Sequence, residues 1–205
     1  MPFNLPNVLT WFRIVLIPLF VAVLYLPGHW LTQHQANAVA MWIFIFAALT
    51  DWLDGYLARR LNQTSAFGAF LDPVADKLMV AAALIVLVEL NRVSAVVALI
   101  IIGREITISA LREWMAKVGQ SKSVAVSMVG KIKTVTQMTA LPFLLYHDRM
   151  GLGLGWNAHE IGVVLIWIAA ALTLWSMIYY LKMALPHTSD GPGGGVFSNR
   201  KKRLK

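Results

Sequence analysis

Two long apolar segments constrain the fold of this chain more than any other feature of its sequence. They are VLTWFRIVLIPLFVAVLYLP, residues 8–27, and IGVVLIWIAAALTLWSMIYYL, residues 161–181. Each has about 20 residues, the length that an α-helix needs to cross the hydrocarbon core of a bilayer. Because 58% of the residues are hydrophobic and only 14% are charged, the sequence predicts an integral membrane protein.

Other bulk features narrow the class of protein. Cysteine is absent, which excludes disulfides, thiolate chemistry and zinc sites built on Cys. We expect the first segment to be a retained helix rather than a cleaved leader, because no small-residue cleavage site follows it. Residues 1–186 are expected to form one membrane domain, and residues 187–205 a flexible Gly-rich linker with a basic tail.

Four further segments are apolar in one half and charged in the other. The charged half comes last in 37–60, first in 68–90, last in 93–117 and first in 122–146. If these segments are consecutive antiparallel spans, all four charged halves lie on one side of the membrane. We therefore predict an all-α integral membrane protein with six transmembrane helices and a polar, metal-binding cavity on that side.

The distribution of basic residues predicts which side this is. Cytoplasmic segments of membrane proteins carry an excess of Lys and Arg. The charged side has Arg59, Arg60, Lys117, Lys122 and the C-terminal NRKKRLK, whereas the other side has Arg92 and Arg149. We therefore expect the charged side and both termini to be cytoplasmic.

Four aspartates lie in the charged halves of the second and third segments. Asp51 and Asp54 are three residues apart, and Asp72 and Asp76 are four apart, so each pair shares one face of a helix. The short connection between the helices makes them antiparallel neighbours whose paired carboxylates face each other. Pro73 lies either just inside a helix start capped by Asp72 or within a helix already begun.

Converging carboxylates repel one another unless a cation holds them. Oxygen ligands without His or Cys select Mg²⁺, Mn²⁺ or Ca²⁺, and Mg²⁺ or Mn²⁺ at a membrane surface suggests a phosphate or diphosphate substrate. The alternative is a solvated face on which the aspartates pair with Arg59, Arg60 and Lys77. The regular spacing, and the small residues Gly55 and Ala58 on the face of Asp51, favour the metal site.

These residues form the pattern D-x₂-D-G-x₂-A-R-x₈-G-x₃-D-x₃-D, from Asp51 to Asp76. It resembles the signature of the CDP-alcohol phosphotransferase family. The resemblance implies six transmembrane helices, a homodimer, and displacement of CMP from a CDP-linked lipid by an alcohol. It also implies that Asp51, Asp54, Asp72 and Asp76 hold Mg²⁺ or Mn²⁺, and that Asp76 is the general base that deprotonates the acceptor.

The resemblance extends to the residues expected to bind the CDP-lipid. Gly55, Arg59 and Gly68 of the pattern would line the pocket for the nucleotide and diphosphate. Asn7 and Thr10 are candidates either for nucleotide contact or for capping the first helix. The full set expected to bind the CDP-lipid is Asn7, Thr10, Gly55, Ala58, Arg59, Ser65 and Gly68.

Two further stretches, residues 3–18 and 103–116, resemble the branch of this family whose acceptor is sn-glycerol 3-phosphate. That branch transfers the phosphatidyl group of CDP-diacylglycerol and gives phosphatidylglycerophosphate and CMP, at the bacterial inner membrane. A phosphorylated acceptor needs a cationic pocket. The candidates are Arg104, Arg112, Lys131 and Lys133, with Glu105 as an orienting partner of Arg104.

The geometry of a helix restricts the cationic pocket, and two other functions fit parts of the sequence. Lys131 and Lys133 are two residues apart and cannot both face the pocket squarely. A sister enzyme would use phosphatidylglycerol, serine or inositol phosphate as acceptor, whereas a divalent-cation transporter would need acidic residues accessible from both sides. The expected partners are CDP-diacylglycerol, sn-glycerol 3-phosphate, membrane lipids and a second copy of the chain, without nucleic acid.

Overall fold

The computed structural model describes residues 5–61, 66–117, 128–148 and 157–184. These residues form six helices, as the sequence predicts. The helices are α1 (Leu5–Leu24), α2 (Gln33–Leu61), α3 (Ala66–Glu89), α4 (Ala95–Lys117), α5 (Met128–Tyr146) and α6 (Ala158–Ala184). Pro73 lies inside α3, so the alternative in which Asp72 caps a helix start is wrong.

The described helices have the lengths and surfaces of membrane helices. They contain 19 to 29 residues, which corresponds to about 30 to 45 Å. Ala158–Lys182 is the one described segment long and apolar enough to span a bilayer by length and composition alone, and the apolar segment Val8–Leu24 is shorter. Large exposed apolar side chains, such as Val15, Leu49 and Leu99, cover the outside and need an apolar surrounding.

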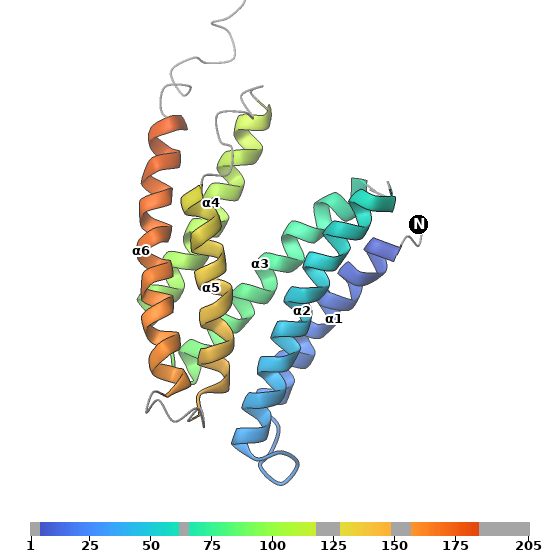
Figure 1. Cartoon of the computed structure of the whole chain (residues 1–205), viewed down its shortest axis with the longest axis vertical. Coiled ribbons are helices and arrows are strands. Elements are labelled where there is room, and N and C mark those ends of the chain that lie inside the picture. Colours follow the sequence, from blue (N-terminus) through green and yellow to red (C-terminus); the bar gives the residue numbers. More distant parts are fainter. Residues whose placement is uncertain (1–4, 62–65, 118–127, 149–156, 185–205) are drawn as a thin grey trace, which may run out of the picture.

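The charged halves of the helices gather at one end of the bundle. The start of α1 and the neighbouring ends of α2 and α3 are at the same end of the bundle as the ends of α4 and α6, toward the top of Figure 1, where the two sets diverge. We call this the aspartate end, because it contains Asp51, Asp54, Asp72 and Asp76. The common side predicted for the charged halves is therefore found in the bundle.

The six helices form two groups of three. α1, α2 and α3 pack on one another, and α6 packs against both α4 and α5. Contacts of α2 with α5, and of α3 with α4 and α5, join the two groups. Figure 1 shows the ribbons of α2 and α5 diverging toward the aspartate end.

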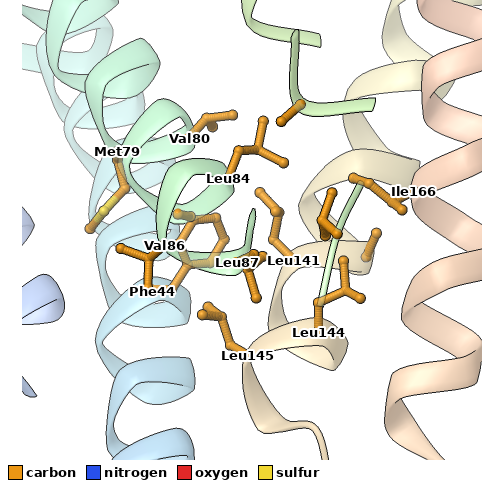
Figure 2. Packing of buried hydrophobic residues seen from close by; sticks show 14 of the residues in the cluster. Phe44, Met79, Val80, Leu84, Val86, Leu87, Leu141, Leu144, Leu145 and Ile166 are labelled. Carbon is orange, nitrogen blue, oxygen red and sulfur yellow. The ribbon is translucent and has the colours of Figure 1, made fainter. Parts of the chain in front are cut away.

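The apolar core fills the other half of the bundle. Phe44 of α2, Leu84 and Leu87 of α3, and Leu141 and Leu144 of α5 are at most 1% exposed and lie side by side (Figure 2). Burial of large apolar side chains between helices of both groups stabilises their packing through close van der Waals contact. The charged halves are therefore supported by a dry, well-packed region beneath them.

A buried arginine cross-links the helices at the end opposite the aspartates. Arg92, in the turn between α3 and α4, donates to Asn37 Oδ1 of α2 at 2.8 Å and to the Leu145 carbonyl of α5 at 2.8 Å. The Leu145 carbonyl belongs to the last turn of α5, where carbonyl groups have no hydrogen-bond partner within the helix. Burial lowers the pKa of Arg92, and nearby Asp148 opposes this shift. Arg92 therefore ties α2, α5 and the α3–α4 turn together.

The close approach of α5 and α6 depends on Gly162, which gives a prediction about stability. A Cβ at Gly162 would lie 2.7 Å from Leu144 Cγ, whereas a Cβ at Gly103 of α4 would meet nothing within 4 Å. We expect Gly162→Ala to lower the free energy of unfolding by about 1–3 kcal/mol. Gly103→Ala, the matched control, should be neutral or stabilising by up to about 1 kcal/mol. Thermal unfolding in detergent measures both, and equal effects of the two substitutions would contradict the packing described.

Candidate active site

A buried arginine on α1 joins aspartates of α2 and α3. Arg13 Nη1 lies 2.9 Å from Asp51 Oδ1 and donates to Asp76 Oδ1 at 2.5 Å. The Arg13 side chain is 1% exposed, while the carboxylates of Asp51 and Asp76 are 37% and 41% exposed. One cationic nitrogen therefore holds two carboxylates that are 25 residues apart in sequence, and both carboxylates remain accessible.

The same face of α1 also holds the second aspartate of α3. Thr10 lies three residues before Arg13, so the two side chains share one face of α1. Thr10 Oγ1 donates a short hydrogen bond to Asp72 Oδ1, and Thr10 is 1% exposed. α1 therefore contacts both aspartates of α3 and one of α2, which fixes the relative position of the two helices.

The floor of this site is apolar. A pocket of about 10 Å³ lies beside Arg13, Asp51 and Asp76, and its other lining residues are Phe44, Ala47, Ala48, Met79 and Met138. This volume is at most that of one water molecule. The side chains of Arg13, Asp51 and Asp76 therefore border an apolar, water-poor region on one side. Electrostatic interactions between them are stronger on that side, because water is excluded there.

The donor set suits a hard divalent cation. Mg²⁺ and Mn²⁺ prefer carboxylate oxygens, and Arg13 already places a positive charge between the carboxylates of Asp51 and Asp76. Within the described residues, no three acidic or histidine side chains converge closely enough to coordinate one ion. The side chain of Asp54 lies outside those described. The four-aspartate metal site therefore remains a prediction that the chemistry of these residues supports.

The residues expected to bind the CDP-lipid fall partly outside the description. Ser65 and the side chains of Asn7, Gly55, Ala58 and Arg59 are not described, although the last three belong to the end of α2. Gly68 is buried in α3. Thr10 is buried against Asp72 and lies in the second turn of α1, so it does not cap that helix.

The predicted cationic residues form a second cluster, on α4 and α5. Arg104 is 5% exposed and donates to Ser176 Oγ of α6 at 3.2 Å. Glu105 Oε1 accepts from Arg104 Nη1 at 3.5 Å and, through a short hydrogen bond, from Lys133 Nζ. Lys133 is 1% exposed, whereas Lys131 is exposed. The two lysines therefore point in different directions, as their two-residue spacing predicts, and Glu105 contacts both Arg104 and Lys133.

An aromatic ring of α6 completes this cluster. The guanidinium carbons of Arg104 and Arg112 each lie 5.9 Å from the centre of the Tyr180 ring. Tyr180 is fully buried, and its ring face attracts cations. The buried ring therefore holds two arginines near each other that would otherwise repel.

α3 and α4 contact each other and carry parts of the two clusters. An apolar pocket of about 130 Å³ at this contact is lined by residues that include Lys77 of α3 and Glu105 of α4. Lys77 follows Asp76 directly in sequence, but neighbouring residues of a helix point in different directions, and Asp76 does not line the pocket. The pocket therefore lies between the two helices that carry the clusters, and Glu105 is the member of the cationic cluster found in its lining.

Sequence reasoning missed three residues of these clusters. Arg13 was treated as part of an apolar span, although a charged residue inside such a span is a signal of function. Ser176 and Tyr180 give no comparable signal, since a hydroxyl in an apolar helix commonly bonds to the helix backbone. Their contacts depend on which face of α6 meets α4, which the sequence pattern does not specify.

Comparisons with known proteins identify the family of this chain. Residues 3–175 match the family described as CDP-alcohol phosphatidyltransferase. The CDP-diacylglycerol–glycerol-3-phosphate 3-phosphatidyltransferase of Salmonella typhimurium is 51% identical over 186 residues, which cover 90% of this chain and 96% of that protein. The proteins of the same name from Escherichia coli and Shigella flexneri are 50% identical with the same coverage. The chain belongs to the CDP-alcohol phosphatidyltransferase family.

Proposed function

We propose that this chain transfers the phosphatidyl group of CDP-diacylglycerol to sn-glycerol 3-phosphate. The products are phosphatidylglycerophosphate and CMP. The observation that carries this proposal is the presence of two clusters at one end of the bundle, one of carboxylates and one of cations, of which Arg104 and Lys133 are buried and Arg112 is exposed. The names of the relatives, which are about 50% identical over nearly their whole length, give the same reaction.

The aspartate cluster is the proposed binding site for the diphosphate of the donor. Asp51, Asp54, Asp72 and Asp76 would hold Mg²⁺ or Mn²⁺, which would supply the charge that a diphosphate in transfer needs. Thr10 and Arg13 keep three of these carboxylates in position from α1. Gly55, Ala58, Arg59, Ser65, Gly68 and Asn7 are proposed to surround the nucleotide and diphosphate, as the family resemblance implies.

Asp76 is the proposed general base. Arg13 holds one oxygen of this carboxylate, and the side chain is 41% exposed, which leaves it within reach of a bound acceptor. Asp76 would take the proton of the acceptor hydroxyl as the hydroxyl oxygen bonds to the phosphorus and the bond to CMP breaks. A fixed position for Asp76 matters because proton transfer requires hydrogen-bond distance to the hydroxyl.

The cationic cluster is the proposed site for the phosphate of the acceptor. Arg104, Arg112 and Lys133 carry three positive charges, and Glu105 offsets one of them. The phosphate of glycerol 3-phosphate carries close to two negative charges at neutral pH, so the charges match. Lys131, which is exposed, is not needed for this match.

The membrane setting of the enzyme is also part of the proposal. The exposed apolar surface supports six membrane-spanning helices, and the basic residues at the aspartate end support a cytoplasmic location for that end and for both termini. A lipid donor and a soluble, charged acceptor would then meet at the inner surface of the bacterial membrane. The homodimer implied by the family resemblance remains a prediction.

Two alternatives are distinguished by experiment. A sister enzyme would release CMP with phosphatidylglycerol, serine or inositol phosphate as acceptor, so competition among acceptors on the purified protein separates these cases. A divalent-cation transporter would move ions into vesicles without CDP-diacylglycerol. The buried cations of α4 and α5 favour a phosphorylated acceptor over serine.

Metal dependence is the first test of this function. We expect CMP release to stop when bound metal is stripped with EDTA, and to return on addition of Mg²⁺ or Mn²⁺, because the aspartates need a cation to hold a diphosphate. CMP release with and without glycerol 3-phosphate is the measurement. Full turnover after complete removal of metal would contradict the proposed site.

Asp76→Asn separates the roles of base and ligand. We expect turnover to fall by at least about a hundredfold, since general-base catalysis contributes about this much or more. Binding of CDP-diacylglycerol should largely persist, because three aspartates remain. Near-normal turnover at neutral pH would exclude Asp76 as the base, whereas complete loss of donor binding would make it mainly a metal ligand.

The two neighbouring lysines of α5 provide a matched test of acceptor binding. Lys133→Gln should lower kcat/KM for glycerol 3-phosphate about tenfold to a hundredfold, because one charge-assisted contact is lost. The KM for CDP-diacylglycerol should change little. Lys131→Gln removes the same charge from the exposed face and should leave both constants close to normal. Equal effects of the two substitutions, or equal effects on both substrates, would show that the cationic cluster is structural.

A further inference from the structure

The position of Arg13 raises a question that the proposed reaction does not answer. Its Nη1 atom lies between Asp51 and Asp76 at 2.9 Å and 2.5 Å, where the family resemblance expects a metal ion. Arg13 thus places a positive charge where the proposed metal ion would also sit. The cation and the arginine therefore act on the same oxygens.

We propose that Arg13 is the built-in counter-ion of the aspartate cluster and weakens the affinity of that cluster for divalent cations. The inference rests on the proposed metal site. In the absence of metal, Arg13 holds Asp51 and Asp76 together and limits their repulsion. When a divalent cation binds, Arg13 stays close and its positive charge opposes the incoming ion.

Burial explains why this effect is large. Arg13 is 1% exposed and lies above an apolar floor that includes Phe44, Met79 and Met138. Charges that face a dry surrounding interact more strongly than charges in water. Removal of one positive charge within hydrogen-bond distance of two proposed ligands should therefore tighten cation binding by about tenfold to a hundredfold.

The proposed counter-ion also has a structural role in the metal-free chain. Without Arg13, Asp51 and Asp76 would face each other with less compensation, so the metal-free protein should be less stable. In a variant without Arg13, a bound cation would take the place of the arginine as the group that joins α2 and α3. The stabilisation gained from the metal should consequently be larger in a variant without this charge than in the unchanged protein.

The test compares variants of the full chain in detergent micelles. Mn²⁺ affinity is measured from the paramagnetic resonance signal of free Mn²⁺, without substrates. Arg13→Gln should bind Mn²⁺ about tenfold to a hundredfold more tightly than the unchanged protein and show a larger Mn²⁺-induced rise in Tm. Arg13→Lys keeps the charge and should stay within about threefold of the unchanged affinity.

A matched control is available at the other end of the bundle. Arg92 is also buried and bonded to several helices, so Arg92→Gln should lower Tm without changing Mn²⁺ affinity. If the Gln side chain is not tolerated at position 13, Arg13→Met is the second neutral variant. A position-13 variant that unfolds in chelator but folds in Mn²⁺ would support the inference.

The outcomes separate this inference from the proposed function. Asp51→Asn should weaken Mn²⁺ binding, and if it does not, both the metal site and the counter-ion are overturned. If Asp51→Asn weakens binding but Arg13→Gln and Arg13→Met bind Mn²⁺ equally or less tightly than the unchanged protein, only the counter-ion is overturned. In that case Arg13 would be a residue that organises the ligands for the metal.

Discussion

The cost of placing charge in hydrocarbon governs the arrangement of this protein. An ionised side chain in a membrane is stable only with a partner or with access to water. The bundle meets this condition by gathering its aspartates and its cationic cluster at one end, where Asp51 and Asp76 remain partly exposed. The opposite half is filled by apolar side chains such as Phe44 and Leu144. The apolar half packs closely, and the charged half contains the residues that we propose carry the chemistry.

The arginines of the charged end illustrate two ways of keeping a guanidinium inside a helix bundle. Arg13 is balanced by carboxylates from two other helices. Arg104 is balanced by one carboxylate, one hydroxyl and an aromatic face. In the proposed function, the first arrangement would leave carboxylates to bind a cation, whereas the second would keep a surplus of positive charge for an anion. The two clusters thus have opposite electrostatic preferences although both contain a buried arginine.

Much of the fold follows from the sequence, because hydrophobic length and the position of charge specify it. Six helices and a common charged end follow from apolar segments whose polar halves alternate along the chain. The sequence pattern does not predict that Arg13 joins Asp51 to Asp76, because Arg13 is 63 residues from Asp76 and lies on another helix. Local spacing determines which residues share a helix face. It does not determine which residue of a third helix fills the space between two faces, and Tyr180 was missed for the same reason.

The network of Arg92 has a mechanical consequence. It fastens α2, α5 and the α3–α4 turn at the end of the bundle farthest from the aspartates, so this end acts as a pivot. α3 has 24 residues and is about 36 Å long, so a rotation of about 5° at the pivot would move its far end by about 3 Å and Asp76, about 20 Å from the fastened end, by about 2 Å. Because Asp76 lies between the fastened end and the outer end of α3, its carboxylate would move less than the outer end of the helix when the bundle flexes.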